Sequence, residues 1–352
     1  MSEMVQAPER SAEARPMDDA ELDGAPRKSF IEAIHDTLLE EMRADERTVV
    51  LGEDVGRRGG VFRVTAGLLE EFGEERVIDT PLAESGIIGS AIGMALNGLR
   101  PIAEIQFLDF IHSAMDQIMN EAARIRYRSN NDFCCPLVIR VPFGGGVHGA
   151  LYHSQSIEAV FVHTPGLKVV TPATPADAKG LLRTAIHDDD PVLYLEHKKM
   201  YRLIKGPVPE GVYDVPFGQA RVVQEGTDAT IIAYGMMVHE ARQAATEVAR
   251  ETGTSIEVID LRSLKPLDEA TVVDSVKKTG KALVVTEANG LCSVASEVAA
   301  LIGEEAFAYL DAPVTRVTAP DVPAMPFSPP LEHAFMVDAE KIGAALRRLI
   351  AF

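Results

Sequence analysis

Residues 48–54, Thr-Val-Val-Leu-Gly-Glu-Asp, carry the clearest signal for the fold. The run from Thr48 to Gly52 is short and apolar, and it ends in glycine followed by acid. Such runs are typical of strands that are buried on both faces of a parallel sheet, and the loops at the carboxyl ends of these strands hold functional groups. We therefore expect a core strand over residues 48–52 and a functional loop at Glu53.

Helical and strand patterns alternate on both sides of this strand. Ser29 is a candidate N-cap for an amphipathic helix that runs to Met42, with Phe30, Ile34 and Leu38 on one stripe. The strands expected after it are 76–80, 100–107, 137–141, 167–171 and 192–195, and the helices are 84–99, 110–127 and 176–186. This alternation predicts an α/β domain built on a mainly parallel sheet.

A second α/β unit follows a break in the pattern. Prolines and glycines are concentrated between Lys205 and Phe217, which predicts an interdomain linker over residues 206–216. The later strands are expected at 229–233, 255–260 and 282–286, and the helices at 239–251 and 268–279. A chain of 352 residues suits two domains, which we place at 28–205 and 217–352. Residues 1–27 are rich in acid and lack periodicity, so we expect a disordered extension there.

Composition excludes several classes of protein. The chain has 34 basic and 53 acidic side chains, a net charge of −19, which argues against nucleic acid binding because a phosphate backbone needs a basic face. No apolar run reaches the roughly 18 residues of a membrane span. Three cysteines fit neither a disulfide framework nor a metal pair. With no secretory or transit signal, these features predict a cytoplasmic protein.

A glycine-rich motif at residues 144–149, Gly-Gly-Gly-Val-His-Gly, matches the spacing of a dinucleotide-binding loop. The context does not support nucleotide binding, because no helix is expected directly after it and position 169 lies in an apolar strand instead of being acidic. His148 and His153 lie in or beside this motif, where flexible backbone and titratable groups coincide. No ligand set accompanies them that would indicate a metal site.

Glu84 lies at the junction between an expected strand and an expected helix. It has two interpretations that spacing alone leaves open. It is either a functional carboxylate at a strand end or an acid that interacts favourably with the helix dipole.

Several strings occur together in a characteristic order. They are Leu51-Gly-Glu-Asp-Val55, Gly59-Gly-Val-Phe62, Thr80-Pro-Leu-Ala-Glu-Ser-Gly86, Ala103-Glu-Ile-Gln-Phe107, Asp116-Gln-Ile with Asn120-Glu-Ala-Ala123, Tyr127-Arg-Ser129, Gly149-Ala-Leu-Tyr-His-Ser-Gln-Ser156, Val258-Ile-Asp-Leu-Arg262 and Ala312-Pro-Val-Thr-Arg-Val317. From about residue 28 to its end, the chain resembles the β subunits of thiamine-diphosphate-dependent 2-oxo acid dehydrogenases. Within that family, the strings at residues 59–62, 127–129 and 149–156 look more like the branched-chain (2-oxoisovalerate) type than the pyruvate type.

The resemblance implies a pyrimidine-binding domain, like the central domain of transketolase, followed by a domain like the C-terminal one. It also implies an α2β2 heterotetramer within a multienzyme complex. In that assembly the α subunit holds the diphosphate and magnesium, and β holds the aminopyrimidine ring. The chain lacks the Gly-Asp-Gly and later Asn pattern that binds magnesium and diphosphate in this superfamily. The implied activity is oxidoreductase: decarboxylation of a branched-chain 2-oxo acid, in branched-chain amino acid catabolism, with acyl transfer to lipoamide on an acyltransferase core.

Site residues follow from the same resemblance, position by position. Glu84 matches the carboxylate that hydrogen-bonds the pyrimidine nitrogen, and His153 matches a histidine that transfers a proton during acyl transfer to lipoamide. Positions that line the cofactor are Glu53, Leu82, Gln106 and Phe110. Phe110 replaces the usual tyrosine of the branched-chain type, and Ile157 replaces a proline that follows the His-Ser-Gln string.

A potassium site in the family, built largely of backbone carbonyls, would map to Leu137, Val138, Ala185, Asp188 and Asp190. The alternative is that the acidic loop at 188–190 only caps the end of a helix.

The sequence is also compatible with other functions. A pyruvate or acetoin dehydrogenase β subunit would share all of these motifs. A non-catalytic assembly module that docks the acyltransferase core is an alternative of another class, and the acidic net charge would help it to attract a basic partner. A single-chain transketolase-like enzyme is disfavoured because the chain lacks a diphosphate-binding half.

Overall fold

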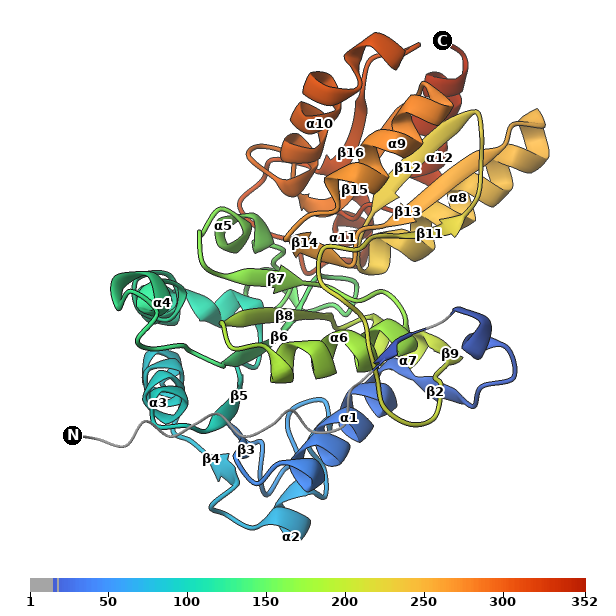
Figure 1. Ribbon diagram of the computed structural model, residues 1–352. Helices are drawn as coiled ribbons and strands as arrows, with labels where there is room; N and C mark the ends of the chain where they lie inside the picture. The colour runs from blue at the N-terminus through green and yellow to red at the C-terminus, as the bar shows by residue number, and fades with distance from the viewer. Residues whose placement is uncertain (1–14, 18) are drawn as a thin grey trace.

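The computed structural model describes residues 15–17 and 19–352 (Figure 1). Two α/β units stack on each other, with the first drawn in blue to green and the second in yellow to red. One holds a seven-stranded sheet and the other a five-stranded sheet. The predicted α/β class with mainly parallel sheets is confirmed. Among the described residues, no helix is long and apolar enough to cross a membrane.

The seven-stranded sheet has the strand order β14-β7-β8-β6-β5-β3-β4. Its strands are β3 (Thr48–Gly52), β4 (Val77–Asp79), β5 (Arg100–Glu104), β6 (Val138–Phe143), β7 (Lys168–Val170), β8 (Val192–His197) and β14 (Ser263–Lys265). All neighbours pair in parallel except β14, which is antiparallel to β7. Every residue of β3 is buried, as the sequence predicted for a core strand.

The helix that precedes β3 begins where the sequence predicted. Helix α1 (Phe30–Ala44) is capped by Ser29, whose hydroxyl accepts the Glu32 backbone N–H while the Glu32 carboxylate accepts from the Ser29 backbone. This reciprocal arrangement satisfies two donors that a helix start otherwise leaves unpaired. The buried stripe of α1 packs on α6 (Pro175–His187). Besides α4, which is described next, the other α-helices of this domain are α2 (Leu68–Phe72), α3 (Glu84–Leu96), α5 (Glu158–Val162) and α7 (Met200–Leu203).

The long helix expected over residues 110–127 is not continuous. It is a series of short turns: a 3₁₀ helix (Leu108–Ala114), a π-helix (Gln117–Glu121), a second 3₁₀ helix (Ala122–Arg124) and α4 (Ile125–Arg128). Tertiary contacts at both ends override the helical pattern. Asp109 directs its carboxylate to the backbone of a distant loop, and a Cβ at Gly166 would lie 1.9 Å from the Ala123 carbonyl oxygen.

The five-stranded sheet has the order β11-β13-β12-β15-β16. Its strands are β11 (Arg221–Gln224), β12 (Ala229–Ala233), β13 (Ile256–Asp260), β15 (Ala282–Asn289) and β16 (Thr315–Ala319). Only β11 pairs in the antiparallel sense. The helices are α8 (Met236–Thr252), α9 (Glu269–Thr279), α10 (Val294–Glu305), α11 (Pro329–Phe335) and α12 (Ala339–Ile350), with α8 packed on α12 and α9 on α10.

The predicted disorder of residues 1–27 needs correction where the structure describes them. Residues 1–14 and 18 lie outside the described part. Beyond them, β1 (Arg15–Pro16) pairs with β10 (Tyr213–Asp214), and β2 (Arg27–Ser29) pairs with β9 (Lys205–Pro207). The segment expected to be only a linker between domains therefore supplies pairing edges for the chain start, a long-range contact that local composition does not reveal.

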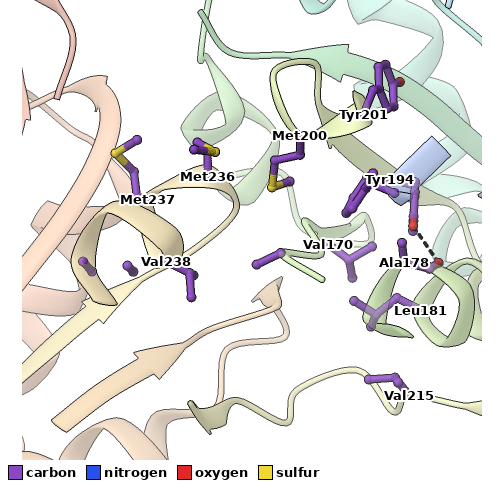
Figure 2. Close-up of a cluster of buried hydrophobic side chains, with 14 of the residues drawn as sticks. Val170, Ala178, Leu181, Tyr194, Met200, Tyr201, Val215, Met236, Met237 and Val238 are labelled. Carbon is purple, nitrogen blue, oxygen red and sulfur yellow. Dashed lines mark hydrogen bonds between the residues drawn. The ribbon is translucent and has the colours of Figure 1, made fainter. Parts of the chain in front are cut away.

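The two domains share strands and core. Strand β14 lies in the chain between β13 and β15 of the second sheet but pairs with β7 of the first. Figure 2 shows the hydrophobic cluster at this junction, where Met236, Met237 and Val238 of the second domain lie near Val170 and Met200 of the first. The Lys265 ammonium also donates to the Val162 and Thr164 carbonyls at 2.8 and 2.9 Å. The domains are therefore one packed unit.

A fully buried guanidinium joins three central strands of the first sheet. Arg140 on β6 makes two hydrogen bonds, of 2.6 and 2.8 Å, to Glu196 on β8 and one of 2.8 Å to Glu104 on β5. Tyr201 donates its hydroxyl to Glu196 at 2.6 Å. Burial raises the pKa of Glu104, and the Arg140 charge opposes that rise. Removing either sign of charge would leave the other unpaired in the core.

We expect Arg140→Met to lower the free energy of unfolding by about 3–5 kcal/mol, because two buried carboxylates would lose their shared cation. Urea titration of the full chain measures this loss. The control is Arg43→Met, which breaks the exposed Arg43–Glu71 pair and should leave the unfolding curve unchanged. Equal stability of the two variants would contradict the role given to Arg140.

Candidate active site

The predicted site residues lie at one edge of the first sheet. Glu53 follows β3, Leu82 and Glu84 follow β4, and Gln106 follows β5. His153 lies in the loop after β6. Because these strands are parallel neighbours, their carboxyl ends meet at the same edge, where α/β proteins bind ligands.

Glu84 is the first residue of α3 and is half-buried. Its Oε2 accepts a hydrogen bond of 3.0 Å from the Ser113 hydroxyl. The N-cap residue Ala83 makes no side-chain cap, and Leu82 before it is 72% exposed. The carboxylate therefore lies at an open edge, held by one hydroxyl and favoured by the helix dipole, a position that agrees with both interpretations of Glu84.

A second carboxylate lies close to Glu84. Burial raises the pKa of Glu53, and the negative charges of Asp54 and Glu84 add to the rise. Gln106 donates its side-chain N–H to the Glu53 carbonyl at 3.3 Å. The structure thus brings Glu53, Glu84 and Gln106 together, as the resemblance implied. When two carboxylates lie close together, their mutual repulsion raises the pKa of one of them. The pair therefore holds a proton more readily than an isolated carboxylate does.

An aromatic cluster surrounds His153. Its ring stands edge-on to Phe107, with centroids 4.5 Å apart, and to Phe110, with centroids 5.4 Å apart. Phe107 and Phe110 are themselves 5.7 Å apart in the same edge-on geometry. The sequence interpretation assigned Phe110 to the cofactor ring and did not single out Phe107. Together the two rings fix the plane of the imidazole.

Two buried carboxylates anchor the loop that carries His153. Asp109 Oδ1 accepts the backbone N–H groups of Ser154 and Gln155, each at 3.2 Å. Glu287, at the end of β15 in the second domain, accepts the Gly145 N–H at 2.6 Å. Burial alone would raise the pKa of Glu287, but the charge of His197 at 3.0 Å and these hydrogen bonds lower it to about 2.

The glycine-rich motif serves packing between domains. A Cβ at Gly144, where φ is +82°, would lie 2.2 Å from the His197 ring, and one at Gly145 would lie 2.3 Å from Met325. His148 is 63% exposed at its side chain, and its Nδ1 is 2.5 Å from Glu332 on α11. The motif therefore attaches the loop to the second domain, which agrees with the expectation that it is not a dinucleotide site.

The end of this loop differs from the proline expected in the family. Ile157 has a backbone φ of −115°, outside the range near −65° that a proline ring fixes. Helix α5 begins directly after it with Glu158, whose carboxylate accepts from Tyr234 of the second domain at 2.5 Å. The loop end is thus held by a tertiary hydrogen bond.

The acidic loop proposed to bind potassium is neutralised by basic side chains. Lys168 lies 2.7 Å from Asp188 and 3.4 Å from Asp190, and Arg126 lies 2.5 Å from Asp190. Arg100 donates to the Asp188 carbonyl at 3.1 Å. The Leu137 and Ala185 carbonyls accept backbone N–H groups at 2.9 and 3.3 Å. These contacts agree with the alternative, an acidic loop at a helix end, and the potassium site stays a prediction.

Sequence reasoning missed several groups that hold the site. They are Phe107, Asp109, Ser113 and Glu287. Glu287 carried a usable signal, because it directly follows the predicted strand 282–286, where functional groups gather. Ser113 lies where a regular helix was expected and Asp109 lies directly before it, and the local pattern does not reveal the targets of either side chain. Within the described residues, no group of three or more His, Cys, Asp or Glu side chains could hold a metal ion.

Comparisons with known proteins agree with this architecture. Residues 27–204 match the transketolase pyrimidine binding domain, and residues 218–342 match the transketolase C-terminal domain. The 2-oxoisovalerate dehydrogenase subunit beta of Bacillus subtilis (strain 168) is 57% identical over 92% of this chain and 99% of its own. The pyruvate dehydrogenase E1 component subunit beta of the same strain is 49% identical over the same shares. A solved structure, a split gene transketolase described as an inactive beta4 tetramer, superposes with a TM-score of 0.71 at 25% identity, covering 92% of this chain and 98% of its own.

The lowered pKa of Glu287 predicts a pH dependence of stability. Because folding lowers this pKa from 4.5 to about 2, the stabilisation is complete above pH 4.5 and is lost as the pH falls towards 2. In that window the advantage of the wild type over Glu287→Gln should shrink by about 1.4 kcal/mol per pH unit. Urea titrations at several pH values measure the difference, and a constant difference from pH 5 to 2 would contradict the assignment.

Proposed function

This chain belongs to the β subunits of the thiamine-diphosphate-dependent 2-oxo acid dehydrogenases, and from that membership we propose that it works with an α subunit to decarboxylate a branched-chain 2-oxo acid and pass the acyl group to lipoamide. The proposal is based mainly on the position of Glu84, a carboxylate at the open start of α3 with Glu53 beside it. The 57% identity to a 2-oxoisovalerate dehydrogenase subunit supports the branched-chain substrate.

The residues present fit an aminopyrimidine ring. Such a ring needs apolar contacts on its faces and a carboxylate at one nitrogen, and the edge offers exposed Leu82, half-buried Phe110 and the Glu84 carboxylate. When bound, thiamine diphosphate supplies the electron sink that lets carbon dioxide leave a 2-oxo acid. We propose that the α subunit holds the diphosphate and magnesium, because this chain lacks the corresponding sequence pattern.

Glu84 acts as the group that holds a proton at the pyrimidine nitrogen. Ser113 donates to its Oε2 and fixes the side-chain orientation, so Oε1 would be the oxygen that holds the ring nitrogen. Gln106 and Glu53 form the neighbouring wall. A carboxylate placed in this way favours the tautomer in which the exocyclic amine can accept a proton.

His153 acts on the acyl-transfer side. Its ring is held between Phe107 and Phe110, and Asp109 fixes the two residues that follow it. Imidazole exchanges protons readily near neutral pH, which suits a group that donates a proton as the lipoyl sulfur is acylated. The aromatic walls exclude water from one side of the ring.

A pyruvate dehydrogenase is the second candidate, supported by the 49% identity to a pyruvate dehydrogenase β subunit. Decarboxylation rates for branched-chain 2-oxo acids and pyruvate, measured with the co-expressed α subunit, separate the two. We further propose that the chain is inactive alone, since the similar split transketolase is described as inactive in its beta4 form. In the complete complex the acyltransferase core, which carries the lipoyl groups, would be a further partner.

Glu84→Gln keeps the size of the side chain and removes its charge, so decarboxylation by the complex with α should fall by about 100-fold or more. The matched control is Glu269→Gln, because Glu269 is likewise the first residue of a helix, α9. That variant should keep full activity, and gel filtration should show normal assembly for both. Near-normal turnover by Glu84→Gln would refute the assignment.

His153→Ala should lower lipoamide acylation by about 100-fold, because the proton donor of that step is lost. Decarboxylation measured with an artificial electron acceptor should fall much less. His333→Ala, at an exposed histidine on α11, serves as the control. Lipoamide-dependent turnover equal to that of the wild type would show that His153 has no such role.

A further inference from the structure

Lys198 is a buried lysine that the proposed chemistry does not use. It directly follows β8 and is 3% exposed. Its backbone is fixed, since its N–H donates to the Phe143 carbonyl at 3.1 Å and its carbonyl accepts from Tyr201 at 3.3 Å. Within the described part of the chain, its ammonium has no hydrogen-bond partner. A buried cation in such a position needs a compensating interaction.

The aromatic ring and the two carboxylates that act on this ammonium also contact or anchor the His153 loop. Its Nζ lies 5.6 Å from the centroid of Phe107, the ring against which His153 stands. The two charged groups that act on it are the carboxylates of Asp109 and Glu287. These are the same two carboxylates that hold the backbone of the His153 loop, at Ser154 and Gly145.

The ammonium is charged at neutral pH in spite of its burial. Burial lowers the pKa of Lys198 to about 8, while the charges of Asp109 and Glu287 oppose that decrease. A group with such a pKa is roughly 90% protonated at pH 7. Lys198 therefore contributes a positive charge to a region that otherwise holds two buried carboxylates and His197.

We propose that Lys198 is a positioning residue for His153: its ammonium balances the two carboxylates that anchor the His153 loop and supports the face of Phe107. Without this cation, Asp109 and Glu287 would lie in the interior with less compensation, and their hydrogen bonds to the loop would weaken. The surroundings of the His153 imidazole would also carry a more negative net charge. The inference rests on the acyl-transfer role proposed for His153, and it assigns Lys198 to that step.

The test uses three variants of the full chain. Lys198→Met removes the charge at similar length, and Lys198→Arg keeps it. The matched control is Lys179→Met, because Lys179 is 2% exposed and its Nζ lies 5.7 Å from the Tyr213 ring, but its ion pair is with Glu40. If Lys198→Met does not fold, Lys198→Gln replaces it with the same expectations.

The first readout is the ratio of lipoamide acylation to decarboxylation in the complex with α. This ratio should fall about tenfold in Lys198→Met, and it should stay within about twofold of the wild type in Lys198→Arg and Lys179→Met. A general loss of structure would lower both rates together and leave the ratio unchanged.

The second readout is the NMR signal of the His153 ring, followed at constant pH in the isolated full chain with labelled histidine. Lys198→Met should shift this signal, because the Phe107 ring against which His153 stands would lose the cation at its face. Lys198→Arg and Lys179→Met should give the wild-type signal.

The proposal stands only if both readouts change in Lys198→Met and neither changes in the controls. A wild-type value for the ratio or a wild-type NMR signal for His153 would overturn it. Failure of the proposed function is seen separately, as absence of decarboxylation by the wild-type complex, and the NMR signal still tests the effect of Lys198 on the His153 region.

Discussion

The rest of the structure depends on the ion cluster of Arg140, Glu104 and Glu196 in the first sheet. Its three members come from adjacent strands, with Glu104 last in β5 and Glu196 next to last in β8, so the hydrogen bonds to Arg140 fix how these strand ends line up. Gln106 and Phe107 follow Glu104 within three residues, and Lys198 follows Glu196 within two. Breaking this cluster would cost several kcal/mol. It therefore fixes the positions of Gln106, Phe107 and Lys198 at the carboxyl edge of the sheet.

Side chains of the second domain also anchor the His153 loop at this edge of the sheet. Glu287 reaches from β15 to Gly145, Glu332 reaches from α11 to His148, and Tyr234 binds Glu158 at the loop end. The His153 loop is therefore anchored by both domains, while Glu84 and Glu53 belong to the first alone. This division matches two halves of the proposed reaction, with the carboxylates acting on the cofactor ring and the histidine loop acting on acyl transfer.

Much of this arrangement could be predicted from the sequence, and the failures share one cause. The buried strand 48–52, the Ser29 cap and the convergence of strand ends depend on local pattern and on the geometry of parallel sheets, so they were predictable. The broken helix at 108–128, the pairing of the chain start and the basic partners of the acidic loop depend on residues distant in sequence. The role of Asp109 was not predictable because its target lies over 40 residues away.

The central claim is that this chain supplies one half of a shared cofactor site, with the carboxylate edge but without the diphosphate half. Isothermal titration calorimetry of magnesium and thiamine diphosphate tests it most directly, with this chain alone, the α subunit alone and the two together. We expect tight binding only when the two subunits are combined. Equally tight binding to this chain alone would contradict it.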